Sequence, residues 1–198
     1  VIDIGMVSTP MLYQAVISYQ DSCGIMVTAS HDPKEYNGFK LCKKNALMLN
    51  KNTGIKEIKN LVCRDKFRKK RQGQIIETNF LEEYIENIFK YVDYQEVKGL
   101  KVVVDAGNGV AGLVIPGIFK RIDSKLISLY FKPDGNFPNR SPNPLDPGSL
   151  LSLQDIVKEK SADLGVAFDG DADRAIFIDE KGKYIGGDLI TALLAKDF

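Results

Sequence analysis

Short apolar runs alternate with segments of helical periodicity along this chain. Residues 101–105 and 124–130 are rich in β-branched and other apolar side chains, which is typical of strands buried on both faces. Residues 80–91 carry apolar side chains at helical spacing and predict an amphipathic helix. Further strands are expected at 1–5, 23–28, 39–42, 162–168 and 175–178, and further helices at 11–19, 55–64, from a turn at 107–112 to about 121, and 148–160.

This alternation predicts the α/β class. We expect two three-layer α/β/α units with mixed, mainly parallel sheets joined by right-handed crossovers. The boundary is placed near residue 80, which gives units at 1–79 and 80–198. The connection at 132–147 contains five prolines, so it is expected to be extended and cannot be helical.

Composition narrows the class of protein. The chain has 198 residues, of which 44% are hydrophobic and 27% charged, as in ordinary globular proteins. The 27 basic and 26 acidic side chains nearly cancel, so no overall field indicates nucleic acid as a partner. The basic run at 64–71 could contact phosphate, but a solvated face is favoured. No apolar stretch is long enough to span a bilayer, and we expect no membrane partner and a cytoplasmic location.

The cysteines indicate neither a zinc site nor a disulfide framework. Cys23, Cys42 and Cys63 are widely spaced and odd in number, so buried or half-buried thiols are expected. The first residues resemble a strand that is already under way. We therefore expect this chain to be a piece of a longer polypeptide.

The strongest chemical signal is an acidic loop, Asp-Gly-Asp-Ala-Asp-Arg, at 169–174. Three carboxylates within five residues repel one another unless a cation compensates them. Oxygen ligands favour a hard cation such as Mg²⁺, Ca²⁺ or Mn²⁺. The plain alternative is a solvated acidic turn.

A calcium loop is one interpretation of this motif. Asp169, Asp171 and Asp173 fall at loop positions 1, 3 and 5, and Glu180 falls at position 12. Arg174, however, occupies the position at which such a loop needs glycine, and the flanking apolar runs predict strands rather than helices. The carboxylates are therefore expected at the end of a strand.

A glycine pattern follows the strand at 101–105. Gly107, Gly109 and Gly112 have the spacing of a dinucleotide-binding turn. The acidic residue that such a fold needs about 20 residues further on is absent from the strand at 125–129. A tight packing turn is therefore favoured over a dinucleotide site.

A second candidate site lies at the end of the strand at 23–28. Ser30 stands beside His31, the only histidine of the chain. Serine at this place could be a nucleophile, a cap or a surface group, and adjacency in sequence does not make a catalytic triad. If a metal polarised an oxygen on Ser30, this hydroxyl could take part in phosphoryl transfer.

Together these segments resemble a known family. The segment TASHDPKEYNGFK at 28–40 and the acidic loop at 169–174 look like the two signature loops of the phosphohexomutases, the phosphomannomutase/phosphoglucomutase family. Residues 5–10, 102–112 and 134–139 are also similar, so the likeness extends over nearly the whole chain. Members interconvert hexose 1-phosphates and hexose 6-phosphates through a sugar bisphosphate.

The resemblance implies a role for each site residue. Ser30 would carry the phosphoryl group, and Lys40 would act near the reacting hydroxyl as a proton-transfer or electrostatic group. Arg174 would contact the phosphoryl region, with a counter-ion for the carboxylates as its alternative. His31 would lie in the site, or would only hydrogen-bond the loop. The Mg²⁺ ligands would be Ser30, through a phosphoserine oxygen, and Asp169, Asp171 and Asp173.

The resemblance also has departures. Asp32 stands where the family loop most often has asparagine, which affects local hydrogen bonding rather than the class of reaction. Family members have four domains, and the chain resembles the end of the first and the second. The expected ligands are a small sugar phosphate and an activating hexose bisphosphate, and further domains are expected in the full-length chain. Two alternatives stay open, a non-catalytic fragment of the family and a calcium-binding module.

Overall fold

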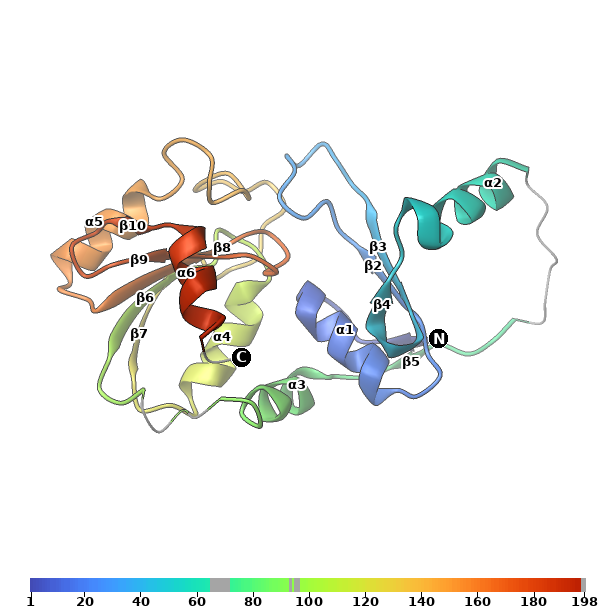
Figure 1. Cartoon of the computed structure of the whole chain (residues 1–198), viewed down its shortest axis with the longest axis horizontal. Helices are drawn as coiled ribbons and strands as arrows, with labels where there is room; N and C mark the ends of the chain where they lie inside the picture. The colour runs from blue at the N-terminus through green and yellow to red at the C-terminus, as the bar shows by residue number, and fades with distance from the viewer. Residues whose placement is uncertain (65–71, 93, 95–96, 197–198) are drawn as a thin grey trace.

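The computed structural model describes residues 1–64, 72–92, 94 and 97–196. The basic run predicted at 64–71 therefore lies outside the described residues, except for Arg64. Figure 1 shows two groups of elements. The helices and strands of residues 1–77 lie on one side, and the larger sheet, formed by strands within residues 101–185, lies on the other.

The first group contains three antiparallel strands and a short parallel pair. Strand β2 pairs with β3, β3 pairs with β4, and β1 pairs with β5. A 3₁₀ turn at Lys44–Ala46 and a wider helical turn at Lys51–Ile55 connect the later elements. The elements are β1 (Ile2–Asp3), α1 (Thr9–Ser18), β2 (Gly24–Val27), β3 (Phe39–Lys43), β4 (Leu47–Met48), α2 (Lys56–Arg64) and β5 (Ile76–Glu77).

Helix α1 begins at Thr9, where the local sequence favours a helix start. The Ser8 side chain caps the helix by accepting a hydrogen bond from the Met11 N–H, and Pro10 lies in the first turn, where its missing N–H costs nothing. Leu12 and Val16 then pack against Cys42 of β3. The helix therefore covers one face of the antiparallel sheet.

The second group is a five-stranded sheet in the order β10-β9-β8-β6-β7. Strands β7 and β8 both run parallel to β6, whereas β9 and β10 are added antiparallel. The elements are α3 (Leu81–Ile88), β6 (Lys101–Asp105), α4 (Ala111–Phe119), β7 (Lys125–Leu129), α5 (Leu151–Glu159), β8 (Leu164–Phe168), β9 (Ala175–Ile178), β10 (Tyr184–Ile185) and α6 (Gly187–Leu194).

Side-chain alternation along β6 produces three layers. Val103 points to one face, where it packs with Leu153 and Val157 of α5. Val102 and Val104 point to the other face, towards side chains of α4. Because both faces of β6 are covered, an almost continuous apolar strand is stable there.

A shared apolar cluster joins the two groups. Met11 and Ala15 of α1 pack with Phe80, just before α3, and with Val114 of α4. Phe80 is 1% exposed. The two groups therefore share a buried interface in addition to the chain that connects them.

The α/β class and the mixed sheets are confirmed. Parallel pairing dominates the centre of the larger sheet, but the β2-β3-β4 sheet is antiparallel throughout. The expected helix at 80–91 ends earlier, at Ile88. The helix expected after the turn at 107–112, reaching about residue 121, spans Ala111–Phe119. The boundary near residue 80 remains a prediction.

Some expectations are corrected. The proline-rich connection at 132–147 is not helical, as predicted, but it folds as a series of turns and bends rather than as an extended segment. Its side chains form hydrogen bonds within the connection, for example from Asn143 to Asp146.

Cys42 is buried, but Cys23 and Cys63 are exposed, and Cys63 lies on α2, which has no buried residue. Elements β4, β5, β10 and α6 were not predicted, and the first three have only two residues each.

Within the described ranges, no helix is both long and apolar enough to cross a membrane.

Candidate functional site: a hydroxyl beside three carboxylates

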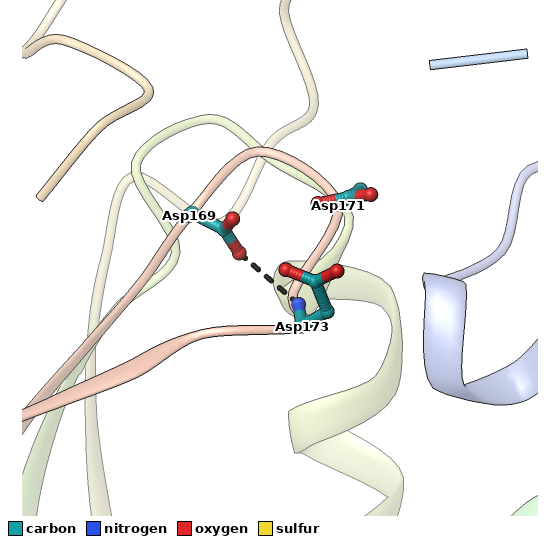
Figure 2. Close-up of side chains that lie close together, drawn as sticks. All are labelled: Asp169, Asp171 and Asp173. Carbon is teal, nitrogen blue, oxygen red and sulfur yellow. Dashed lines mark hydrogen bonds between the residues drawn. The ribbon is translucent and has the colours of Figure 1, made fainter. Parts of the chain in front are cut away.

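The acidic loop links two antiparallel strands. Strand β8 ends at Phe168 and β9 starts at Ala175, and these two residues are paired in register. The Asp169 Oδ1 atom accepts a hydrogen bond from the backbone N–H of Asp173 at 3.0 Å (Figure 2). It also accepts one from the backbone N–H of Arg174 at 3.1 Å. The loop is thus folded around its own first carboxylate, and the strand flanks exclude the helix pair of a calcium loop.

Asp169 has an oxygen without a described hydrogen-bond partner. Its side chain is 0% exposed, and Oδ2 is buried and makes no hydrogen bond. The pKa of Asp169 rises to about 6, mainly because the carboxyl group is buried. The hydrogen bond from the Arg174 N–H lowers this pKa, whereas the negative charges of Asp171 and Asp173 raise it. A buried, unsatisfied carboxylate oxygen is costly unless something binds it.

Asp171 joins the two groups of elements. Its Oδ2 accepts a hydrogen bond from Thr9 Oγ1 at 2.6 Å, and its Oδ1 accepts one from Ser30 Oγ at 3.1 Å. Its backbone carbonyl also accepts the Thr9 N–H at 3.0 Å. Burial would raise the pKa of Asp171, but the hydrogen bonds from Lys40, Thr9 and Ser30, with the Lys40 charge, hold the pKa below its usual value.

Lys40 supplies a positive charge to this cluster. Its Nζ lies 2.6 Å from Asp171 Oδ2 and 2.5 Å from Asp173 Oδ2. Burial by itself would lower the pKa of Lys40, but the bonds and charges of the two carboxylates raise it above its ordinary value. Lys40 is therefore held as an ammonium group here.

Ser30 lies in a strained part of the backbone. Its φ is 57°, in the left-handed region that non-glycine residues rarely adopt, and its N–H donates to Thr28 Oγ1 at 2.8 Å. His31 Nδ1 is 3.4 Å from Ser30 Oγ. The hydroxyl is half-buried and faces Asp171. Non-glycine residues in such conformations cluster at functional sites.

Arg174 lies at the edge of the cluster. Its Nε is 3.9 Å from Asp169 Oδ2, and its side chain is half exposed. This separation is too long for a hydrogen bond. The guanidinium is therefore available to a ligand as well as to the carboxylate.

Close backbone contacts explain the glycine pattern after β6. A Cβ on Gly109 would come within 2.6 Å of the Gly170 carbonyl oxygen, and one on Gly112 within 2.0 Å of the Phe131 carbonyl oxygen. The Val110 N–H also donates to the Gly170 carbonyl at 3.1 Å. Gly109 therefore allows the turn to pack against the acidic loop, and Gly112 allows the start of α4 to approach Phe131. Both contacts support the packing turn rather than the dinucleotide site.

Two contributors escaped the sequence analysis. Thr9 lies in the similar segment at 5–10 and Arg140 in the proline-rich connection, but the sequence alone singles out neither as a site residue. Arg140 is buried and donates from Nε to Asp105 Oδ2 at 2.8 Å and from Nη2 to the Phe168 carbonyl at 2.7 Å. It therefore ties the end of β6 to the residue that precedes Asp169. An arginine in a polar loop gives no sequence signal for such a contact.

The donor set fits a hard divalent cation. One oxygen from each of Asp169, Asp171 and Asp173 can be chosen so that all three lie within 4.8 Å of one another. The set contains only oxygen, and Asp169 has a buried, unsatisfied oxygen, Oδ2. Both features suit Mg²⁺ better than zinc or copper.

The fold and the site define an α/β protein in which two units bring a serine hydroxyl to a carboxylate cluster. Comparisons with known proteins agree with this description. Residues 82–182 match the model of phosphoglucomutase/phosphomannomutase, alpha/beta/alpha domain II, and residues 1–69 match that of domain I. The chain belongs to the phosphoglucomutase/phosphomannomutase family.

Several relatives carry mutase names. The chain is 39% identical to a Vibrio cholerae phosphomannomutase and 38% identical to one from Escherichia coli K12, over 100% of its own length but only 44% and 45% of theirs. A crystal structure of a family protein from Burkholderia thailandensis matches with a TM-score of 0.88 and 33% identity, covering 99% of this chain and 43% of that one. The chain thus spans less than half the length of these relatives.

Proposed function

We propose that this chain carries the phosphoserine and metal-binding part of a phosphohexomutase, an isomerase that interconverts hexose 1-phosphates and hexose 6-phosphates. The observation that carries the proposal is the 3.1 Å contact between Ser30 Oγ of the first unit and Asp171 Oδ1 of the second. Family membership and the mutase names of the relatives support it.

Ser30 is proposed to carry the transferred group. In the first half-reaction, a sugar hydroxyl oxygen forms a bond to phosphorus while the bond from phosphorus to Ser30 Oγ breaks. The hydroxyl proton ends on Ser30 Oγ, so a hexose monophosphate becomes a bisphosphate and the serine is restored. In the second half-reaction the same exchange runs backwards at the other end of the sugar.

The remaining site residues are proposed to bind and to stabilise charge. Asp169, Asp171 and Asp173, with an oxygen on phosphorylated Ser30, would hold Mg²⁺, which supplies charge neutralisation for phosphoryl transfer. Lys40, whose pKa is raised, would remain cationic near the reacting oxygen through its contact with Asp171. Arg174 would contact the phosphoryl oxygens, and His31 would orient the Ser30 hydroxyl.

The proposal extends to ligands and context. A hexose phosphate is the substrate and a hexose bisphosphate is the intermediate and activator, and the cytoplasmic location stays a prediction. Because phosphoryl transfer depends on positioning, the isolated chain is expected to be an impaired mutase.

The calcium-binding module is not favoured, since strands flank the loop. Intact Ser30, Lys40 and aspartates argue against a decayed site.

The test is phosphorylation of the chain itself. The chain is incubated with glucose 1,6-bisphosphate and Mg²⁺, and the site of any added phosphoryl group is found by mass spectrometry of peptides. We expect phosphate on Ser30 and none after Mg²⁺ is removed with a chelator. Ser30→Ala should abolish the modification.

Ser22→Ala is the matched control, because the Ser22 hydroxyl bonds the Val16 carbonyl and lies outside the cluster. Equal labelling of the Ser30→Ala chain would contradict the role of Ser30. If Ca²⁺ supported labelling to the same extent as Mg²⁺, this result would contradict the assignment of Mg²⁺ to the site. Assays of a full-length protein that contains this chain, with glucose 1-phosphate and mannose 1-phosphate, would then identify the sugar.

A further inference from the structure

Thr9 holds Asp171 at two points. Its backbone N–H donates to the Asp171 carbonyl at 3.0 Å, and its hydroxyl donates to Asp171 Oδ2 at 2.6 Å. Thr9 is 0% exposed and Asp171 is 4% exposed, so little water can compete for these bonds. Two bonds between the same two residues fix the position of the loop and also the rotation of the carboxylate.

The start of helix α1 makes both donors available. Thr9 is the first residue of the helix, and the first N–H groups of a helix have no acceptor within the helix itself. A threonine hydroxyl often bonds a carbonyl of the preceding helical turn, but at this position there is no preceding turn. Met11, two residues further along α1, packs in the cluster that contains Phe80 and Val114. The helix that carries Thr9 is therefore itself fixed against the second group of elements.

The Thr9 hydroxyl has a second neighbour, Met26 Sδ, at 3.0 Å. A hydroxyl has one proton to donate, and a thioether sulfur is a weak acceptor. The carboxylate oxygen of Asp171 is nearer and charged, and a hydrogen bond to an ionised group is about twice as strong as one between neutral groups. The proton therefore belongs to the bond with Asp171. Met26 offers a control substitution, because changing it removes only the weaker contact.

The two oxygens of Asp171 have different surroundings. Oδ2 accepts the Thr9 hydroxyl and lies 2.6 Å from Lys40 Nζ, whereas Oδ1 accepts the Ser30 hydroxyl at 3.1 Å. A cation near Oδ1 would repel the Lys40 ammonium, and the Ser30 hydroxyl can rotate its proton away. The Thr9 hydroxyl is neutral and is held in place by its helix and by the second bond. Thr9 therefore keeps Oδ2, and Oδ1 is the oxygen left for a cation.

We propose that Thr9 is a positioning residue that makes Asp171 present one oxygen, Oδ1, to the cation, and that it thereby favours Mg²⁺ over Ca²⁺. This inference rests on the proposed metal site. Mg²⁺ demands near-ideal octahedral geometry, whereas Ca²⁺ accepts carboxylates that bind through one oxygen or through both. A carboxylate without the Thr9 bond is free to turn and to offer both oxygens, which suits Ca²⁺ and not Mg²⁺.

The test compares the affinities of the chain for Mg²⁺ and Ca²⁺ by calorimetric titration. Thr9→Val removes the hydroxyl but keeps the β-branched shape and the backbone N–H. We expect Mg²⁺ affinity to fall about tenfold or more, as is typical when the hydrogen bond that orients a ligating side chain is lost. Ca²⁺ affinity should fall less than about threefold, because Ca²⁺ tolerates either arrangement of the carboxylate. The ratio of the two affinities should therefore drop.

Two further variants separate positioning from packing. Thr9→Ser keeps the hydroxyl and should keep the affinity ratio of the unsubstituted chain. Met26→Leu removes the sulfur with little change in volume and should also leave the ratio unchanged. A second measurement needs no metal, because three-bond NMR couplings report the χ1 angle of Asp171. We expect a single rotamer in the unsubstituted chain and in Thr9→Ser, and averaging between rotamers in Thr9→Val.

Three results would overturn the proposal. The first is a ratio that Thr9→Val leaves unchanged, with loss of stability in urea as its only effect, which would reduce Thr9 to a packing role. The second is a ratio that Thr9→Ser lowers as much as Thr9→Val does. The third is an equal drop in Met26→Leu. If the unsubstituted chain bound neither cation, the proposed metal site would fail and this selectivity with it, so the two failures are distinguishable.

Discussion

Asp171 differs from its neighbours in the acidic loop because it contacts three residues of the first unit. It contacts Thr9, Ser30 and Lys40, whereas Asp173 is exposed and contacts Lys40. Both carboxylates nevertheless belong to the proposed metal site. Substitutions at these two positions should therefore differ in their effect on stability, although both should weaken metal binding.

Asp171→Asn should lower the free energy of unfolding by about 1–3 kcal/mol, because the neutral amide weakens buried hydrogen bonds. Asp173→Asn should change it by less than about 0.5 kcal/mol, as expected for an exposed residue. Both should weaken Mg²⁺ binding. Urea denaturation and calorimetric titration measure the two quantities, and equal losses of stability would contradict the difference between the residues.

Lys40 would compete with a bound metal for the same carboxylates, because its Nζ contacts Asp171 and Asp173. Lys40→Met should strengthen Mg²⁺ binding about two- to tenfold, because a neighbouring positive charge is removed and partly exposed ion pairs contribute about 0.2–1 kcal/mol. The same change should reduce labelling of Ser30. Lys40→Arg, which keeps the charge, should leave Mg²⁺ affinity near its original value. Weaker Mg²⁺ binding by Lys40→Met would show that Lys40 supports the site rather than competing for it.

At the scale of elements, the Arg140–Asp105 pair holds the carboxyl ends of β6 and β8 together. Both side chains are buried, and the Gly107 N–H also donates to Asp105 at 2.7 Å. Burial raises the pKa of Asp105, and the charge and hydrogen bond of Arg140 only partly oppose that rise. The strand ends that carry the acidic loop thus depend on this pair.

Arg140→Met should destabilise the fold by about 3–5 kcal/mol at neutral pH, because it leaves a buried carboxylate without its counter-charge. Without Arg140 the pKa of Asp105 rises further, and a raised carboxyl pKa means that stability is lost as pH increases through it. The deficit should therefore shrink as pH falls from about 7 towards 5. Urea denaturation at several pH values checks this, and a deficit independent of pH would contradict the assigned role of Asp105.

The turn between β6 and α4 should also control the acidic loop. Gly109→Ala places a Cβ 2.6 Å from the Gly170 carbonyl, so the loop must shift and Mg²⁺ affinity should fall about tenfold or more. Gly135→Ala is the matched control, because a Cβ there meets nothing within 4 Å. Calorimetric titration of both variants with Mg²⁺ decides the point. Equal affinities would show that the turn yields without moving the carboxylates.

At the scale of the whole molecule, the site exists only while the two units remain packed together. The cluster around Phe80, Met11 and Val114 provides the apolar part of that packing. The bonds of Asp171 to Thr9 and Ser30 provide the polar part.

Phe80→Ala should cost about 3–5 kcal/mol, as expected for a large buried side chain. Because Phe80 lies between the units, it should also increase hydrogen exchange at the Thr9 amide, which bonds the Asp171 carbonyl. Tyr91→Ala, at an 88% exposed position, is the control and should change neither property. If only the amides of α3 exchanged faster and the Thr9 amide stayed protected, the units would hold together without this cluster.

Much of the local structure could be predicted from patterns close in sequence. Ser8 and Pro10 marked the start of α1, and the apolar run at 101–105 marked β6. The two-residue strands β4, β5 and β10 are stabilised mainly by their partners, and each is too short for a periodic pattern in the sequence to specify it. The antiparallel pairing of β2 and β3 likewise depends on contacts across a loop.

The sequence by itself determined the chemistry that this protein carries: three alternating aspartates, a serine loop and a lysine, in an order that resembles one family. Only the tertiary structure decided that Ser30 faces Asp171 and that Thr9 and Arg140 support the loop. The physical reason is distance along the chain. Ser30 and Asp171 are 141 residues apart, and their contact follows from the packing of two units, which no local pattern encodes.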